Sequence, residues 1–194
     1  KNGTEPESGS NTEPRETDPG RSAKTSPKLA DEGDDPQTSK TPAKPNSADI
    51  AAFKQATVAL QVALGSQDFD RARLELENAK AAATTDEQES MVTGYTQLTD
   101  LAEQFWRTVD STVEAFEGAE ELKVGSGGLI VLVVETGPET ITIRKEGRNL
   151  KYAFTEMPPG LALAIARQKL SVSQPDHLAQ LGACLATAPD RKQI

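Results

Sequence analysis

Hydrophobic positions follow a helical spacing through the middle of the chain. From Ser47 they recur among many alanines without a proline, and the run ends at Gly65, a residue type that often closes helices. Over residues 68–83 a second apolar stripe repeats at spacings of three and four. The pattern predicts helices over 48–64 and 68–83, and the short connection between them predicts antiparallel packing.

A third and longer helix is predicted over residues 85–118. Thr85 and Gln88 have the spacing of a capping box, in which each side chain satisfies a backbone N–H group at the helix start. Apolar residues then alternate at steps of four and three as far as Phe116, and Gly118 ends the run. Packing of this stripe on the preceding helices is the simpler interpretation, and self-association through 85–118 is the alternative.

The last third of the chain changes to the alternation that is typical of β-strands. Short turns rich in Gly, Pro and Asn separate its segments and suit hairpins. The predicted strands are 122–124, 129–134, 140–144 and 150–154. They indicate a four-stranded antiparallel meander, either an open sheet or a small SH3-like barrel. Because 129–134 is aliphatic throughout, we expect a central strand that is covered on both faces.

Two further helices are predicted after the strands, and prolines open both. The first starts at Met157-Pro158-Pro159-Gly160 and is apolar on most faces, so we expect it to be buried against the sheet. The second starts near Pro175. The fold class is therefore α+β. The predicted regions are a linker (1–47), a three-helix region (48–119) and a small β domain with two C-terminal helices (120–194).

Composition and charge differ between these regions. The chain has 194 residues, of which 36% are hydrophobic, and a net charge of −9. Residues 1–47 are rich in Pro, Ser, Thr and Glu, so we expect a disordered linker that buries too little apolar surface to fold. The net charge is −2 over 1–47, −10 over 48–121 and +3 over 122–194. An acidic helical region thus precedes a basic β region.

Several chemistries are excluded by the residue types that the chain lacks. One Cys and one His cannot build a zinc site or a disulfide, and no cofactor or metal is expected. The Gly-rich segment 125–128 precedes a strand rather than a helix, which argues against a nucleotide-binding loop. We interpret His177 as a surface or capping residue and Cys184 as a core residue. No segment is apolar over the length that a membrane span needs.

Acidic residues lie along the outward faces of the predicted third helix. They are Glu103, Asp110, Glu114 and Glu117. Carboxylates at helical spacing bind metal or act as acid and base only where they converge in a cleft. Because the one His lies elsewhere in the sequence, a solvated helix face is the interpretation.

The one polar cluster that we single out is a basic hairpin. Strand alternation places Arg144 and Lys151 on the outward face, and Lys145 and Arg148 lie in the turn between them. Such a patch is either merely solvated or binds a partner protein. Nucleic acid is the least favoured partner, because Tyr152 is the only aromatic residue nearby and its alternation points it inward.

One resemblance concerns the second predicted helix. Its residues Asp68-Phe69-Asp70-Arg71-Ala72, Leu76 and Ala79 resemble the second helix of a tetratricopeptide repeat. The match covers about half a repeat, and no second copy follows at the period of about 34 residues that such repeats have. A plain helical hairpin with small residues at a close contact is the favoured interpretation.

A second resemblance concerns the C-terminal part. The strings Met157-Pro158-Pro159-Gly160-Leu161-Ala162 and Leu181-Gly182-Ala183, together with Gly147-Arg148-Asn149, are similar to uncharacterised proteins of planctomycete bacteria. Those proteins carry a similar module after a low-complexity linker and helices. The resemblance implies a bacterial origin and this architecture. It implies no catalytic residue, because the family has no known activity.

Together these features favour a non-catalytic protein-interaction or scaffold module on a flexible tether. The alternatives are an enzyme that uses carboxylates such as Glu135, Glu139 or Glu156, and a structural part of a larger envelope protein. Because the chain begins with Lys1, we expect a signal peptide, an anchor or a further domain upstream. An extracytoplasmic or membrane-tethered location is favoured over a cytoplasmic one.

Overall fold

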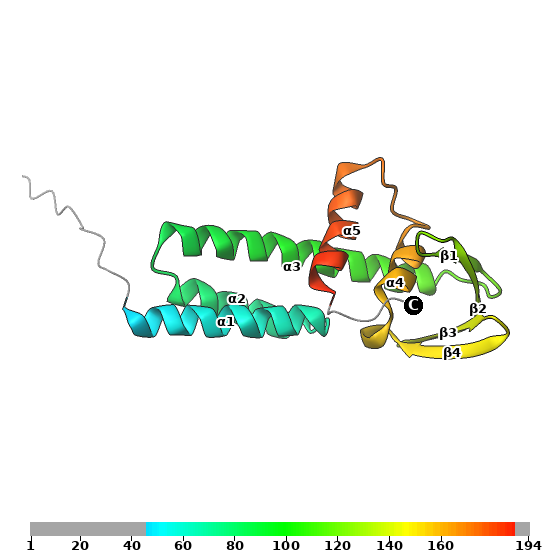
Figure 1. Cartoon of the computed structure of the whole chain (residues 1–194), viewed down its shortest axis with the longest axis horizontal. Helices are drawn as coiled ribbons and strands as arrows, with labels where there is room; N and C mark the ends of the chain where they lie inside the picture. The colour runs from blue at the N-terminus through cyan, green and yellow to red at the C-terminus, as the bar shows by residue number, and fades with distance from the viewer. Residues whose placement is uncertain (1–45, 189–194) are drawn as a thin grey trace, which may run out of the picture. The chain divides into compact units, whose positions relative to one another are not determined.

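The computed structural model describes residues 46–188, which form helices, an antiparallel sheet and then two more helices (Figure 1). These residues belong to one compact unit, and their layout is the predicted α+β fold. The helices are α1 (Ser47–Gly65), α2 (Phe69–Ala82), α3 (Asp86–Val113), α4 (Pro159–Ala166) and α5 (Pro175–Thr187). The strands are β1 (Glu121–Val124), β2 (Leu129–Gly137), β3 (Thr140–Lys145) and β4 (Arg148–Ala153), and a 3₁₀ turn, η1 (Phe154–Glu156), follows them. The predicted linker lies outside the described residues, apart from Asn46 and Ser47.

Polar side chains fix the starts of the first three helices. Asn46 caps α1 and Asp68 caps α2, each by accepting a bond from a backbone N–H group of the first turn. Thr85 accepts from the Gln88 N–H group (3.2 Å), as the capping box predicts. The Gln88 side chain accepts from the backbone N–H of Thr84 (2.8 Å), one residue before the predicted partner.

Helices α1 and α2 form the predicted antiparallel hairpin (Figure 1). Gln67 turns the chain between them with a positive φ of 61°. Small residues let the two backbones approach, since Ala63 and Ala72 are buried at the contact beside Leu60. The hairpin therefore has a core of its own, to which Tyr95 and Leu98 of α3 add.

Helix α3 ends at Val113, earlier than the predicted end near Gly118. After Val113 the chain tightens, because Ala115 and Phe116 donate to carbonyls three residues back rather than four. The apolar stripe of α3 is used within the chain. Its first half packs on the hairpin, and Phe105, Val109 and Val113 join the core beneath the sheet. The predicted region boundary at residue 119 therefore falls in the connection between α3 and β1, two elements that share this core.

The sheet is an open antiparallel meander in the order β1-β2-β3-β4, so the open-sheet alternative to a barrel is the correct one. Ile141 and Ile143 of β3 lie at its centre and are completely buried. A two-residue loop joins β3 and β4. Its residues, Glu146 and Gly147, both have positive φ (51° and 79°), as a type I′ hairpin requires.

The expectation that both faces of β2 are covered is wrong. Val131 and Val133 point into the core, but Ile130 is 55% exposed and Val134 is 36% exposed. The covering elements α3 and α4 contribute to the core on the inner face only. A bulge after Val133 shifts the register with β3, so that Glu135 pairs with Thr142. An unbroken aliphatic run therefore occurs here in a strand with one solvated face.

The main core lies between the inner face of the sheet, α4 and the second half of α3. Leu161, Ala162, Ile165 and Ala166 of α4 are completely buried, as its composition predicted. Phe105 meets the half-buried Trp106 in an edge-to-face contact with ring centroids 5.4 Å apart.

Candidate functional site

An open apolar groove lies between α1 and α3, and residues at the C-terminal end of α5 also line it. Its volume is about 730 Å³. Its walls carry Val58 and Val62 of α1, which are 52% and 60% exposed. The lining is Val58, Gln61, Val62, Leu64, Gly65, Ser66, Tyr95, Leu98, Ala186, Thr187 and Ala188. The groove brings together residues that are far apart in the sequence.

The sequence of α1 explains why it serves two surfaces. Leu60 and Leu64 lie one turn apart and fill the hairpin core. Val58 and Val62 also lie one turn apart, but they point away from that core into the groove. A helix that buries one stripe needs no second apolar stripe for stability. That second stripe was the sequence signal of the groove, and the sequence reasoning missed it by treating all these residues as one pattern.

A polar pair links the two walls of the groove. The Gln61 side chain of α1 donates to the hydroxyl oxygen of Tyr95 on α3 at 2.6 Å. The ring of Tyr95, like Leu98, packs against the hairpin core. The groove thus has rigid apolar walls with hydroxyl and amide groups at one place, which are able to bond the backbone of a bound chain.

The groove is uncharged although the helical region that carries it is acidic as a whole. None of the eleven lining residues is ionisable except the Tyr95 phenol. The net charge over residues 48–121 is nevertheless −10. The site is therefore suited to an uncharged apolar segment rather than to a cation.

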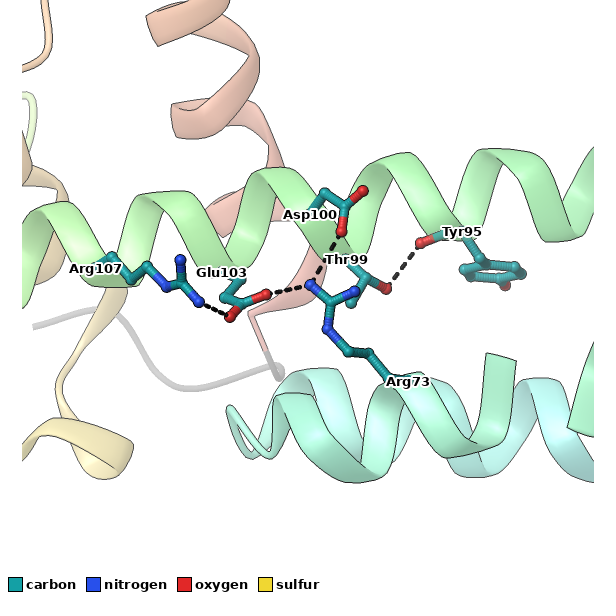
Figure 2. A network of polar contacts seen from close by, with 6 residues as sticks. All are labelled: Arg73, Tyr95, Thr99, Asp100, Glu103 and Arg107. Carbon is teal, nitrogen blue, oxygen red and sulfur yellow. Dashed lines mark hydrogen bonds and ion pairs between the residues drawn. The ribbon is translucent and has the colours of Figure 1, made fainter. Parts of the chain in front are cut away.

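A network of charged side chains fixes α2 against α3 (Figure 2). Arg73 of α2 reaches Asp100 at 3.2 Å and Glu103 at 2.5 Å on α3, and Arg107 reaches Glu103 from the same helix. The hydrogen bond and charge of Arg73 lower the pKa of Glu103, against the opposing effect of burial. Because the two cations and two carboxylates satisfy one another, we interpret the network as a surface link between α2 and α3, in which each exposed ion pair contributes about 1 kcal/mol or less.

A second pair of carboxylates lines a separate pocket of about 420 Å³. Asp110 of α3 and Glu114, the residue that follows α3, line it together with Thr136, Pro138 and Phe154. Partial burial, and secondarily the charge of Glu114, raise the pKa of Asp110. Asp110 is nevertheless exposed, as the interpretation of a solvated helix face expected. The other lining residues carry no ionisable side chain, so the pocket holds two neighbouring carboxylates rather than a complete catalytic set.

The substitution Asp110→Asn is expected to stabilise the protein at pH 7, by a few tenths of a kcal/mol after allowance for solvent screening. The amide removes a charge that its surroundings disfavour. Because the folded pKa of Asp110 lies above its ordinary value of 3.8, the penalty is present above the folded pKa and disappears as the pH falls through it.

Urea unfolding at pH 7 and near pH 3.5 measures this effect. The stabilisation should be present at the higher pH and absent at the lower one. Glu117→Gln, which removes an exposed carboxylate outside the pocket lining, is the control. A variant less stable than the wild type at pH 7 would contradict the assignment.

The structure separates the four cations of the predicted patch. Arg144 and Lys151 share the outward face of the sheet, and Arg144 donates to Asn149 across the hairpin at 3.0 Å. Lys145 pairs with Arg148 at the hairpin end, where strand alternation directs both toward the opposite side. The hairpin therefore places two cations on each side of the sheet. Their role in partner binding stays a prediction.

The lone Cys and the lone His of the sequence both lie where they have a structural role. Cys184 is buried, and burial raises the pKa of its thiol to about 12, so it is not a reactive nucleophile. His177 accepts a bond at Nδ1 from the Ser171 N–H group (3.0 Å) in the segment before α5, whereas no side chain caps the start of α5 itself. Within residues 46–188, no three acidic, His or Cys side chains are grouped as metal ligands.

Glu135, Glu139 and Glu156, proposed as catalytic carboxylates in the enzyme alternative, are all exposed. None of them lines the pockets described above. They lie on β2, in the following turn and in η1. The pockets described here for residues 46–188 therefore do not bring these three carboxylates together.

Each described helix also falls short of the length and apolar character that crossing a membrane requires. Comparisons with family models, with curated proteins and with solved structures match nothing to this chain. The resemblances to tetratricopeptide helices and to planctomycete proteins therefore stay predictions.

Proposed function

We propose that this chain is a non-catalytic protein-interaction module whose groove between α1 and α3 binds an uncharged, apolar segment of a partner protein. The observation that carries the proposal is the exposure of Val58 and Val62 in the wall of a groove of about 730 Å³. Neither residue is needed for the hairpin core. Exposed apolar surface in a concave site is typical of binding sites.

The charge distribution supports a partner segment of this chemistry. A basic segment would be attracted to the acidic helical region as a whole but would find no carboxylate in the groove itself. An acidic segment would be repelled by the net charge of −10 over residues 48–121. An uncharged segment with apolar side chains neither needs a carboxylate in the groove nor is repelled by the negative charge. Its binding should therefore depend little on salt.

The alternatives have weaker support. The apolar stripe of α3 is buried within the chain, so self-association through 85–118 would require surface other than that stripe. An enzyme that uses Glu135, Glu139 or Glu156 would need these exposed side chains to converge. The scaffold role and the tethered location remain proposals that accompany the interaction module.

Selection of phage-displayed random peptides against the full chain tests the proposal. The selected peptides are expected to carry two or more apolar side chains and little charge. Val62→Arg, which places a charge in the groove wall, should weaken their binding at least about tenfold, a change of about 1.4 kcal/mol. Isothermal titration calorimetry at low and high salt measures both the loss and the expected salt insensitivity.

Ile130→Arg is the matched control, because Ile130 is an aliphatic residue of similar exposure (55%) on the sheet. This variant should keep the wild-type affinity within about twofold. Thermal unfolding of both variants verifies that each is folded. Failure to enrich any peptide, or equal losses in the two variants, would contradict the groove as the binding site.

A further inference from the structure

We infer that a second cavity, between the β1–β2 turn and α4, binds a small apolar carboxylate. This inference is independent of the proposed interaction groove. The cavity has a volume of about 510 Å³, which is within the usual range for small-molecule sites. Its lining is Val124, Gly125, Ser126, Gly127, Leu129, Pro159, Gly160, Leu163, Arg167 and Leu185.

The walls of this cavity offer apolar surface that the core does not use. Leu129 and Leu163 are only partly buried, because each packs against the core on one side and borders the cavity on the other. Leu185 of α5 is 59% exposed and borders the cavity as well. Three leucines from three different elements therefore surround space large enough for a short hydrocarbon group.

One cation stands in this apolar lining. Arg167, the C-cap residue of α4, is the only charged residue of the cavity, and no hydrogen bond or ion pair engages its side chain within residues 46–188. By contrast Lys169, two residues later, is held by the Ser111 carbonyl at 2.8 Å. In a chain with 30 acidic and 21 basic residues, an unpaired guanidinium beside apolar walls is available for an anionic ligand.

The turn between β1 and β2 forms one side of the cavity. Gly125 and Gly128 have positive φ (70° and 65°), which glycine adopts without strain. Gly127, by contrast, does not have a positive φ, and a Cβ built on it would meet no atom within 4 Å. A larger side chain is therefore sterically acceptable at Gly127 and would narrow the cavity from this side.

The combination of groups selects the ligand class. A single guanidinium forms two parallel hydrogen bonds with a carboxylate, and the leucines suit one attached apolar group. A phosphate dianion would leave charge unmatched, because Arg167 is the only cation of the lining. A medium-chain fatty acid and the C-terminal residue of an apolar peptide share the required chemistry.

Nuclear magnetic resonance titration of the full chain with octanoate tests this inference. Saturable shifts are expected for the amides of Gly125 and Gly127. Octan-1-ol lacks the carboxylate and should bind at least about tenfold more weakly. A parallel titration with N-acetyl-leucyl-leucine identifies the source of the ligand. Tighter binding of octanoate indicates a fatty acid, and tighter binding of the dipeptide indicates a peptide C-terminus.

Variants connect the binding to the cavity. Arg167→Gln should weaken octanoate binding about tenfold, and Leu185→Asn about threefold. The matched controls are Arg71→Gln, which removes an exposed cation of α2, and Leu178→Asn, which alters a leucine of α5 that is 55% exposed and lies outside the cavity lining. Both controls should bind like the wild type.

Gly127→Phe provides a second route to the same conclusion, because it should obstruct the cavity while leaving Arg167 in place. Thermal unfolding establishes that each variant is folded. The inference is overturned if octanoate shows no saturable shifts below about 10 mM. It is also overturned if Arg167→Gln and Gly127→Phe are both folded and both bind octanoate as the wild type does.

Discussion

Phe105→Ala is expected to lower the free energy of unfolding by about 3–5 kcal/mol. Phe105 is completely buried in the core that joins α3 to the sheet, and its ring contacts Trp106 edge to face. Truncation loses the transfer free energy of the ring and leaves a cavity. The surrounding β-strands and α4 restrict collapse into that cavity, which places the cost in the range for large aromatic residues.

Urea unfolding monitored by circular dichroism and by Trp106 fluorescence measures this loss. Because α3 contributes to both the hairpin core and the main core, the two signals should change in one coincident transition. Val172→Ala, at a residue that is 61% exposed, is the control and should cost less than about 0.5 kcal/mol. A loss below about 1 kcal/mol, or two separate transitions, would contradict this description of the core.

Leu60→Ala is expected to lower the free energy of unfolding by about 2–5 kcal/mol, because it leaves a cavity in the hairpin core. Leu60 is completely buried between α1 and α2, beside Ala63 and Ala72. The alanines already bring the backbones close, so little further approach is available to fill the space that the leucine leaves. The cavity should therefore persist, which favours the upper part of the range.

Val58→Ala is the matched control for Leu60→Ala, because Val58 lies on the same helix but is 52% exposed in the groove. We expect it to change the free energy of unfolding by less than about 0.5 kcal/mol. The pair thus distinguishes the two apolar stripes of α1 by one equilibrium unfolding experiment. Similar losses for both variants would show that Val58 belongs to the core and not to a free binding surface.

Local chemistry allowed much of the fold to be predicted. The capping residue Thr85 located the start of α3, because its side chain bonds only to nearby backbone groups. Alternation in β3 placed Ile141 and Ile143 inside and Arg144 outside, which the register confirms. These features depend on residues close in sequence, and sequence patterns report them directly.

Features that depend on distant packing were less predictable. The aliphatic run of β2 fits a strand covered on either one or both faces, and only the placement of α3 and α4 leaves Ile130 exposed. Helix α3 ends at Val113, where the chain turns toward β1, and not at Gly118. In both cases tertiary packing selects between local structures of similar free energy.

The candidate sites likewise differ in whether their residues are close in the sequence or far apart. The basic hairpin was visible because its residues are close in sequence, yet Lys145 and Arg148 leave the face that carries Arg144. The groove joins Val62 and Leu98 with the end of α5, and nothing in the sequence indicates that these segments meet. The link from Arg73 to Glu103 likewise spans 30 residues.

The most direct test of the proposed interaction site is to locate a selected peptide on the full chain by methyl nuclear magnetic resonance. Isoleucine, leucine and valine methyl groups report on both the groove and the outer face of the sheet. We expect the largest saturable shifts at Val58, Val62 and Leu98, with the methyl groups of Ile130 and Leu132 unchanged. Largest shifts at Ile130 and Leu132, with the groove methyl groups unchanged, would contradict the proposed site.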